Sequence, residues 1–274
     1  MPSGKLTGQV AWISGGASGM GEAIARLFAG EGASVAIADV QADRGRSLAE
    51  SIQKDGGKAD FHPCDVTRES DIRDSINAAE SNFGGLQILV NCAGIVHVKP
   101  LHEYSIEAWD ELMAVNVRSI FLAVKHGLPH LRKNRRSYVV NVGSIGSFIG
   151  QGLTPAYIAS KGAVLQLTRG IALDYAADGL RANCVCPGIT DTPMLREHLN
   201  ATIDPEETLR KRLRRVPTGV ALTPLDIAKA VLYLSCKDSS GITGTSLIVD
   251  GGYLAAAEWD SGGKTAFMDR DRTP

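Results

Sequence analysis

Short runs of apolar and β-branched residues alternate along the chain with longer segments of helical pattern. The runs are apolar throughout rather than at every second position, which is typical of strands buried on both faces of a sheet. Seven runs predict strands at 10–14, 34–39, 58–62, 87–91, 137–142, 181–186 and 246–249. The segments between them predict helices near 19–31, 43–55, 69–83, 106–133, 155–177 and 224–235.

This alternation predicts an α/β fold, because consecutive parallel strands need a crossover connection that is usually a helix. We expect a doubly wound, mostly parallel, seven-stranded sheet with helices on both faces. No linker, repeat or low-complexity tract interrupts the order, so residues 1–253 are predicted to form a single domain. Two segments depart from the pattern. A charged insertion occupies 190–223, and a tail of mixed charge occupies 254–274.

The composition is that of an ordinary soluble enzyme, with 274 residues, 44% of them hydrophobic, and a net charge of -1. Such a balance gives no sign of a nucleic-acid or anionic-membrane partner. The five cysteines are odd in number and form no Cys-x-x-Cys pair, which argues against a disulfide framework or a zinc site. No apolar segment is long enough to span a bilayer, and the N-terminus does not resemble a signal peptide. We therefore expect a cytoplasmic enzyme without a metal.

A glycine-rich segment follows the first predicted strand and opens the first predicted helix: Ser14-Gly15-Gly16-Ala17-Ser18-Gly19-Met20-Gly21. A helix N-terminus exposes unpaired N–H groups and the positive end of the helix dipole, which suit a pyrophosphate. Glycines let the backbone turn sharply and approach the phosphates closely. The alternative is a tight turn without a ligand. The strand-turn-helix context favours dinucleotide binding.

Asp39 ends the second predicted strand, where an acidic side chain can accept hydrogen bonds from the adenosine ribose and repel a 2′-phosphate. No Lys or Arg stands in the glycine segment or directly after Asp39. Arg44 is the nearest cation, and we expect it to be solvated on the following helix. These features predict NAD rather than NADP as the cofactor. The alternative for Asp39 is a role as a helix cap or turn residue.

Three polar residues form the candidate reaction centre. Tyr157 and Lys161 stand four residues apart in a predicted helix, so they share one face. A lysine ammonium near a phenol favours the phenolate, which can serve as a general base toward an alcohol or a general acid toward a carbonyl. Ser144 follows the fifth predicted strand, at the strand end where open α/β sheets bind ligands. Its hydroxyl can orient the substrate oxygen.

Taken together, these residues resemble the short-chain dehydrogenase/reductase family in its simple one-domain form, over residues 6–253. The glycine segment is similar to the family's Thr-Gly-x-x-x-Gly-x-Gly, with Ser14 in place of threonine. Asn91-Cys92-Ala93-Gly94 is similar to Asn-Asn-Ala-Gly, with Cys92 in place of asparagine. Asp65-Val66 resembles the pair that contacts adenine. Residues 187–192 resemble Pro-Gly-x-x-x-Thr, which holds the nicotinamide carboxamide.

The resemblance implies a Rossmann-like fold, a homotetramer, and hydride transfer between NAD and a secondary alcohol or sugar hydroxyl and its carbonyl. It also implies that the catalytic residues are Asn116, Ser144, Tyr157 and Lys161. Lys161 would bind the nicotinamide ribose, and Asn116 would hold a water of a proton relay. The cofactor-binding residues implied are Ser14, Gly15, Ser18, Gly19, Met20, Gly21, Asp39, Asp65, Val66, Asn91, Ala93, Gly94, Tyr157, Lys161, Pro187, Gly188, Ile189 and Thr192.

Specificity is expected to come from loops over the reaction centre: 95–97 with His97, 148–153 with Gln151, and the insertion 190–223. Gln151 and the modest aromatic content favour a polyhydroxylated or small cyclic alcohol. A run of five cations within 210–215 has two interpretations. It is either a solvated helix face, paired with Glu206 and Glu207, or a contact for an anionic substrate group.

Other functions remain open from the sequence alone. A steroid or acyl carbonyl reductase would use the same reaction centre. A non-catalytic NAD-binding sensor would not need the intact catalytic set. A methyltransferase also uses a glycine-rich turn after its first strand, but that interpretation leaves Tyr157 and Lys161 unexplained.

Overall fold

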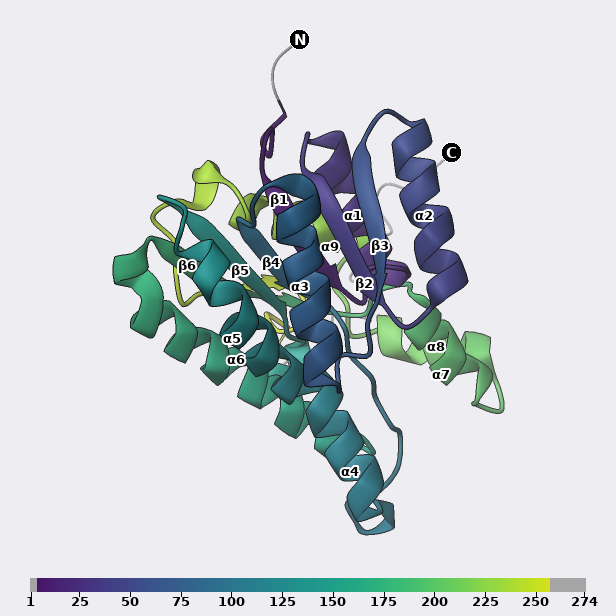
Figure 1. The fold of residues 1–274 in the computed structure, drawn as a ribbon. Coiled ribbons are helices and arrows are strands. Elements are labelled where there is room, and N and C mark those ends of the chain that lie inside the picture. The colour runs from purple at the N-terminus through teal and green to yellow at the C-terminus, as the bar shows by residue number, and fades with distance from the viewer. Residues whose placement is uncertain (1–3, 257–274) are drawn as a thin grey trace.

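The computed structural model describes residues 4–256, and a single sheet runs through them (Figure 1). The strand order is β3-β2-β1-β4-β5-β6-β7, and every pairing is parallel. The strands are β1 (Val10–Ser14), β2 (Ser34–Asp39), β3 (Lys58–Pro63), β4 (Ile88–Asn91), β5 (Ser137–Val142), β6 (Leu180–Pro187) and β7 (Ser246–Val249). The predicted seven-stranded sheet is confirmed, and it is parallel throughout.

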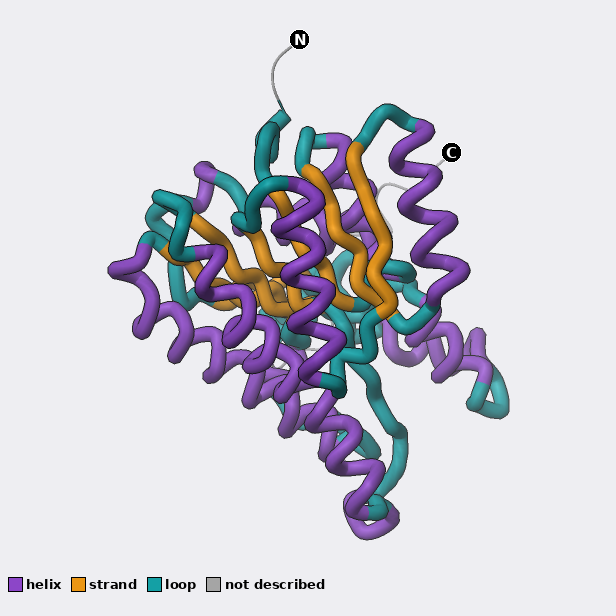
Figure 2. Tube along the Cα trace, in the orientation of Figure 1, coloured by secondary structure: helices purple, strands orange, loops and turns teal. Residues whose placement is uncertain are grey.

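Helices cover both faces of the sheet, which confirms the doubly wound architecture (Figures 1 and 2). One face carries α1 (Gly19–Gly30), α2 (Ala42–Lys54) and α9 (Pro224–Leu234). The other face carries α3 (Glu69–Phe83), α5 (Ser119–Leu131) and α6 (Pro155–Tyr175), which lie toward the viewer in Figure 1. The predicted bounds of these helices agree with the structure to within two residues, except at α5.

The apolar strand pattern is explained by a core on each side of the sheet. In β1, Ile13 packs into the cluster with Phe28 of α1, whereas its neighbour Trp12 packs into the opposite cluster with Ile76 of α3. All four side chains are fully buried. Successive side chains of a strand point to opposite faces, so a strand between two helical layers is mostly apolar rather than alternating.

The segment 106–133, predicted as one helix, is divided in the structure. It comprises α4 (Ile106–Met113), a π-helical turn (Ala114–Arg118) and α5. The π turn contains Asn116, whose amide makes hydrogen bonds outside the helix. A π turn inserts one extra residue into a helix and is frequent at functional sites. Tertiary bonds favour this turn, and they leave no trace in the apolar pattern of the sequence.

The sheet places a crevice at the carboxyl ends of β1 and β4. From β1 the chain adds β2 and β3 on one side, then returns to place β4 on the other side of β1. This reversal is a topological switch point, where open α/β sheets bind ligands. The insertion 190–223 lies at this end and contains α7 (Pro193–Asn200) and α8 (Pro205–Leu213). Within residues 4–256, no helix is both long and apolar enough to cross a membrane.

Candidate active site

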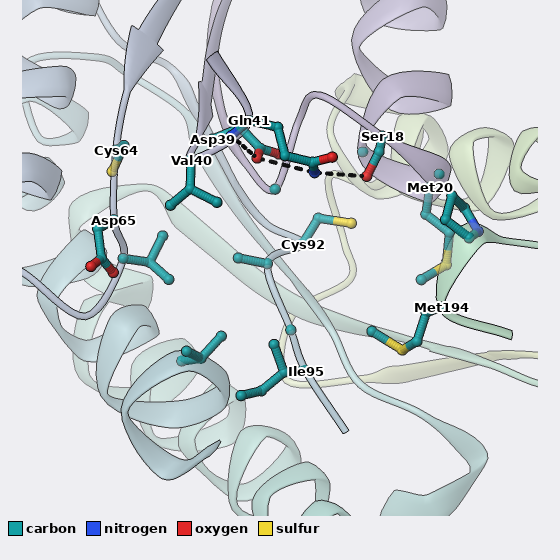
Figure 3. A pocket seen from close by; sticks show the side chains of 18 of the residues that line it. Ser18, Met20, Asp39, Val40, Gln41, Cys64, Asp65, Cys92, Ile95 and Met194 are labelled. Carbon is teal, nitrogen blue, oxygen red and sulfur yellow. Dashed lines mark hydrogen bonds between the residues drawn. The ribbon is translucent and has the colours of Figure 1, made fainter. Parts of the chain in front are cut away.

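A groove of about 490 Å³ opens at the carboxyl ends of β1, β2 and β4 (Figure 3). Most of the residues predicted to bind a cofactor line it. They are Gly15, Ser18, Gly19, Met20, Gly21, Asp39, Asp65, Val66, Ala93, Gly94 and Thr192. These residues come from five separate parts of the sequence, and the fold brings them together. The groove's size and position suit an extended ligand that lies across the strand ends.

The glycine turn fits closely against its neighbours. Gly15 has a φ of +64°, and a Cβ atom there would lie 2.8 Å from the backbone N of Ala93. A Cβ on Gly21 would collide with the carbonyl of Gly15. Ser18 is the N-cap of α1, yet its side chain makes no capping bond, so the first N–H groups of the helix lack a side-chain acceptor. The turn therefore offers backbone donors to a phosphate.

Two of the predicted cofactor residues support the groove from beneath without lining it. The buried Ser14 hydroxyl accepts hydrogen bonds from the backbone N–H groups of Cys92, at 3.2 Å, and Ala93, at 3.3 Å. These bonds join the end of β1 to the segment that follows β4. Asn91 is also buried, and its amide donates to Asn141 on β5 at 2.7 Å. Both residues fix the strand ends that form the groove.

Asp39 organises the end of the groove that lies beside β2. Its carboxylate accepts hydrogen bonds from the backbone N–H groups of Ala17, at 3.0 Å, and Gln41, at 2.9 Å. The Gln41 amide in turn bridges Asp39 and Ser18, as Figure 3 shows. Among the described residues, no Lys or Arg lines this groove. Arg44 is exposed on α2 and donates to Gln41 instead.

Several residues of the groove carry no sequence signal that predicted them. Gln41, Thr67, Glu111 and Met194 all line it. Gln41 follows Asp39 by two residues and is the member that a motif could have suggested. Cys92, which replaces the family's asparagine, also lines the groove. Burial raises the pKa of its thiol to about 12, so Cys92 adds no charge there at neutral pH.

A second cavity, of about 510 Å³, adjoins the groove. Met20, Thr192 and Met194 line both spaces and so join them. The predicted residues that line the second cavity are Met20, Ser144, Tyr157, Pro187, Gly188, Ile189 and Thr192. Thr192 is also the N-cap of α7, because its hydroxyl accepts from the Leu195 N–H at 3.3 Å. This bond fixes α7 at the junction of the two spaces.

Ser144 and Tyr157 meet in the wall of the second cavity although they come from different elements. Ser144 follows β5, and its hydroxyl accepts from the Gly146 N–H at 3.0 Å. Tyr157 is half-buried near the start of α6, where Pro155 occupies the first helical position that proline favours. Two hydroxyl-bearing residues thus line one space at the carboxyl end of the sheet.

Lys161 lies one turn along α6 from Tyr157 and is only 5% exposed. Its ammonium donates to the carbonyl of Val142 at 2.8 Å and lies 5.7 Å from the centre of the Tyr157 ring. A methyl group added to Gly94, which lines the groove, would lie 3.6 Å from that ammonium, although Lys161 itself lines neither cavity among the described residues. The i, i+4 spacing in the sequence thus places the buried Lys161 ammonium beside the phenol of Tyr157.

Asn116 is buried behind Lys161. It accepts from the Ile95 N–H at 2.8 Å and donates to the Ile95 carbonyl at 2.9 Å and to the Ser160 hydroxyl at 3.0 Å. A Cβ on Gly94 would lie 3.5 Å from its amide oxygen. Asn116 therefore holds the segment after β4 against α6, close to the lysine. It lines neither cavity among the described residues.

The three segments expected to set specificity contribute unequally. Val96, Val98 and the stretch 151–154 line the second cavity, together with α7, α8 and Tyr253. His97 does not line it. Its ring lies beside that of Tyr104, with the ring centres 6.2 Å apart. The histidine in the cavity is His198 of α7, which no sequence motif marked. Leu153 has a φ of +59°, a strained conformation that is frequent at functional sites.

The parallel sheet, the glycine turn at the start of α1 and the half-buried Tyr157 beside a buried Lys161 are typical of a nucleotide-dependent oxidoreductase of the α/β class. A family model described as "Enoyl-(Acyl carrier protein) reductase" matches residues 15–254. The chain is 39% identical to 2-(S)-hydroxypropyl-CoM dehydrogenase 3 of Xanthobacter autotrophicus, over 92% of this chain and 99% of that protein. It is 37% identical to a cyclopentanol dehydrogenase of Comamonas testosteroni, over 92% and 99%.

Solved structures agree with these sequence matches. The structure of a levodione reductase superposes with a TM-score of 0.89 at 28% identity, covering 92% of this chain and 100% of that one. The chain belongs to the short-chain dehydrogenase/reductase family, as its motifs predicted. It is an oxidoreductase that acts on CH–OH groups and uses a nicotinamide cofactor.

Proposed function

We propose that this protein transfers a hydride between NAD and a secondary alcohol or sugar hydroxyl and its carbonyl, with Tyr157 as the acid/base. The observation that carries the proposal is the convergence of Ser144 and Tyr157 in a cavity that adjoins the glycine-turn groove. Lys161 lies buried behind this pair. The groove suits a dinucleotide, and the adjoining cavity suits a small substrate at its nicotinamide end.

The residues present fit NAD. The glycine turn leaves no room for a Cβ at Gly15 or Gly21, and α1 offers uncapped N–H groups to the pyrophosphate. Asp39 would accept hydrogen bonds from the adenosine ribose and repel a 2′-phosphate. The absence of a Lys or Arg in the described lining of the groove supports NAD over NADP. The bound nicotinamide supplies the hydride acceptor or donor.

The side chains of this chain would handle the proton. Ser144 would donate a hydrogen bond to the substrate oxygen and hold it against the Tyr157 hydroxyl. In the oxidation direction, Tyr157 takes the alcohol proton as the carbon loses hydride, and in reduction it returns that proton. The Lys161 ammonium favours the phenolate through its positive charge. Asn116 is a positioning residue that holds the backbone beside Lys161, where a water could pass the proton to solvent.

The cavity supports a small cyclic or polyhydroxylated alcohol as substrate. Its wall combines apolar side chains, such as Val96 and Leu195, with the polar Gln151 and Thr154. One of the relatives is named for cyclopentanol. A compact ring with one or more hydroxyl groups would make use of both kinds of side chain. Cyclopentanol, neutral aldoses and anionic sugars are therefore the first substrates to offer with NAD.

Replacement of Tyr157 by Phe tests the mechanism. The change removes the hydroxyl and keeps the ring, so we expect a folded protein that still binds NAD. General acid–base catalysis contributes about 100- to 10,000-fold, so kcat should fall by that factor. The assay follows nicotinamide absorbance, and fluorescence titration gives the NAD dissociation constant.

Tyr175→Phe is the matched control, because Tyr175 stands on the same helix and lines neither cavity among the described residues. It should keep wild-type turnover. A Tyr157→Phe protein whose kcat stays within about threefold of wild type would contradict Tyr157 as the acid/base. Clear NAD binding by the wild type without turnover of any alcohol would instead favour the sensor alternative.

We further propose that residues 1–253 act as one NAD-binding and catalytic domain within a homotetramer. Exposed apolar side chains on α4, α5 and α6 support association. Ile106 is 76% exposed, Phe121 is 52% exposed and Leu173 is 81% exposed. Light scattering after size-exclusion chromatography measures the assembly, and a monomer at micromolar concentration would contradict it. Residues 257–274 of the predicted tail lie outside the described residues.

A further inference from the structure

The cations at 210–215 fall into two groups, one that lines a cavity and one that does not. Lys211, Arg212 and Arg215 line the cavity that also contains Ser144 and Tyr157. Arg210 and Arg214 do not line it. Arg210, Lys211 and Arg212 lie in the last turn of α8, which ends at Leu213, whereas Arg214 and Arg215 lie in the turn that follows it. The two interpretations of the run therefore apply to different residues within it.

The cations outside the cavity match the solvated interpretation. Arg210 forms an ion pair with Glu207, one turn earlier in α8. Lys211 lines the cavity but also lies within reach of Glu207, at 3.7 Å, so its charge is partly compensated. In the part of the chain that the structure describes, Arg212 and Arg215 form no ion pair with an acidic residue. The Arg215 guanidinium instead lies 5.1 Å from the centre of the Tyr253 ring, another residue of the cavity wall.

The cavity offers these cations no counter-charge. No Asp or Glu of residues 4–256 lines it. His198, on α7, is the other titratable base in the wall. Burial and the nearby Arg212 lower the pKa of His198, so its imidazole is neutral at pH 7 and can still donate or accept a hydrogen bond. A cavity with three cations and no acid attracts an anion, because each guanidinium binds a carboxylate, sulfonate or phosphate through charge-assisted bonds.

We propose that the substrate carries an anionic group, and that Arg212 and Arg215 bind this group while Ser144 and Tyr157 hold the reacting oxygen. The proposal rests on the proposed function and names the substrate class for that same cavity. Lys211 adds a third positive charge at the cavity mouth, and Tyr253 positions the Arg215 guanidinium. The substrate is thus a secondary alcohol, or its ketone, with a terminal carboxylate, sulfonate or phosphate.

Matched substrate analogues separate the charge from the rest of the substrate. We would compare 5-hydroxyhexanoate, 5-hydroxyhexane-1-sulfonate and 4-hydroxypentyl phosphate with the neutral 5-hydroxyhexanamide, each with NAD. The variants are Arg212→Gln and Arg215→Gln, with Arg214→Gln as the control from outside the cavity. Calorimetric titration of ethane- to hexane-1-sulfonates, and of the corresponding alkyl carboxylates and phosphates, into the NAD-bound enzyme measures anion binding without turnover.

The expected result is a higher kcat/KM for one of the anionic analogues than for the amide. Loss of a charge-assisted contact costs about 10- to 100-fold, so the anion-to-amide ratio should fall by that factor in Arg212→Gln and in Arg215→Gln. Arg214→Gln should keep the wild-type ratio. The best analogue among the three identifies the anion. Binding of the matching alkyl anion should weaken by a similar factor in the two cavity variants alone.

Three outcomes would overturn the proposal. The wild type could use the amide as well as the anions and bind none of the alkyl anions. Both cavity variants could lower kcat/KM equally for charged and neutral analogues, which would indicate a structural role. Arg214→Gln could reduce the anion-to-amide ratio of kcat/KM as much as the cavity variants, which would indicate a general effect of surface charge rather than a specific contact. Anion binding that depends on Arg212 and Arg215 without any turnover would keep the anion site and reject the proposed reaction.

Discussion

The two hydrogen bonds of Ser14 give a prediction that joins stability to cofactor binding. Ser14→Ala removes the acceptor of the Cys92 and Ala93 N–H groups, which lie 3.2 and 3.3 Å from the Ser14 hydroxyl oxygen. An unsatisfied buried donor costs about 1–3 kcal/mol. Both bonds are longer than the usual 2.9–3.0 Å, so the lower value applies to each, and the total is about 2 kcal/mol.

For a chain of this size, a loss of about 2 kcal/mol lowers Tm by about 4–8 °C. Differential scanning fluorimetry measures it, first without NAD and then with saturating NAD. Ser14→Thr is the matched control, because threonine keeps the hydroxyl and is the residue that the family's motif carries at this position. It should stay within about 2 °C of wild type. NAD should also bind more weakly to Ser14→Ala, because Cys92 and Ala93 line the groove.

A Ser14→Ala protein with the Tm and NAD affinity of the wild type would refute this reasoning. It would mean that water from the groove replaces the lost acceptor at no cost. A lower Tm with unchanged NAD affinity would mean that the bonds support the sheet without shaping the groove. Equal losses in Ser14→Ala and Ser14→Thr would assign the effect to packing around the side chain rather than to its hydroxyl.

Two further predictions concern single carboxylates. Asp39→Asn removes the charge that would repel a 2′-phosphate and keeps one acceptor for the Ala17 or Gln41 N–H, so the NADP-to-NAD ratio of kcat/KM should rise about tenfold. An unchanged ratio in steady-state assays would contradict that role. Asp226→Ala breaks the capping box with Thr223 at the start of α9 and should cost about 1 kcal/mol in urea unfolding at pH 7. Hydrogen bonds from Thr223 lower the pKa of Asp226 below 3.8, so this stabilisation is present above the unfolded pKa and lost as the pH falls through the folded pKa. If the unfolding free energies of wild type and Asp226→Ala differ by the same amount at pH 7 and at pH 3, the ionised carboxylate is not the stabilising group.

The sequence determined the layers of the fold because its signals are local. Apolar runs such as 10–14 and 137–142 match β1 and β5 residue for residue, since a strand covered on both faces is mostly apolar rather than alternating. The glycine turn was also predictable, because a side chain at Gly15 or Gly21 would collide with the neighbouring backbone. Tyr157 and Lys161 were paired by their spacing alone, since four residues make about one helical turn.

Contacts between distant segments could not be predicted from the sequence. The π turn contains Asn116, which makes hydrogen bonds to Ile95, and no local pattern within 106–133 predicts the turn. The difference between His97 and His198 is similar, because both lie in segments near the site and only the packing decides which ring faces the cavity. The run of cations at 210–215 shows the same division. Its composition fixed the charge, but which guanidinium groups share a cavity with Ser144 and Tyr157 was decided by how α8 packs on α7 and by the turn that follows Leu213, because these set the direction of each side chain.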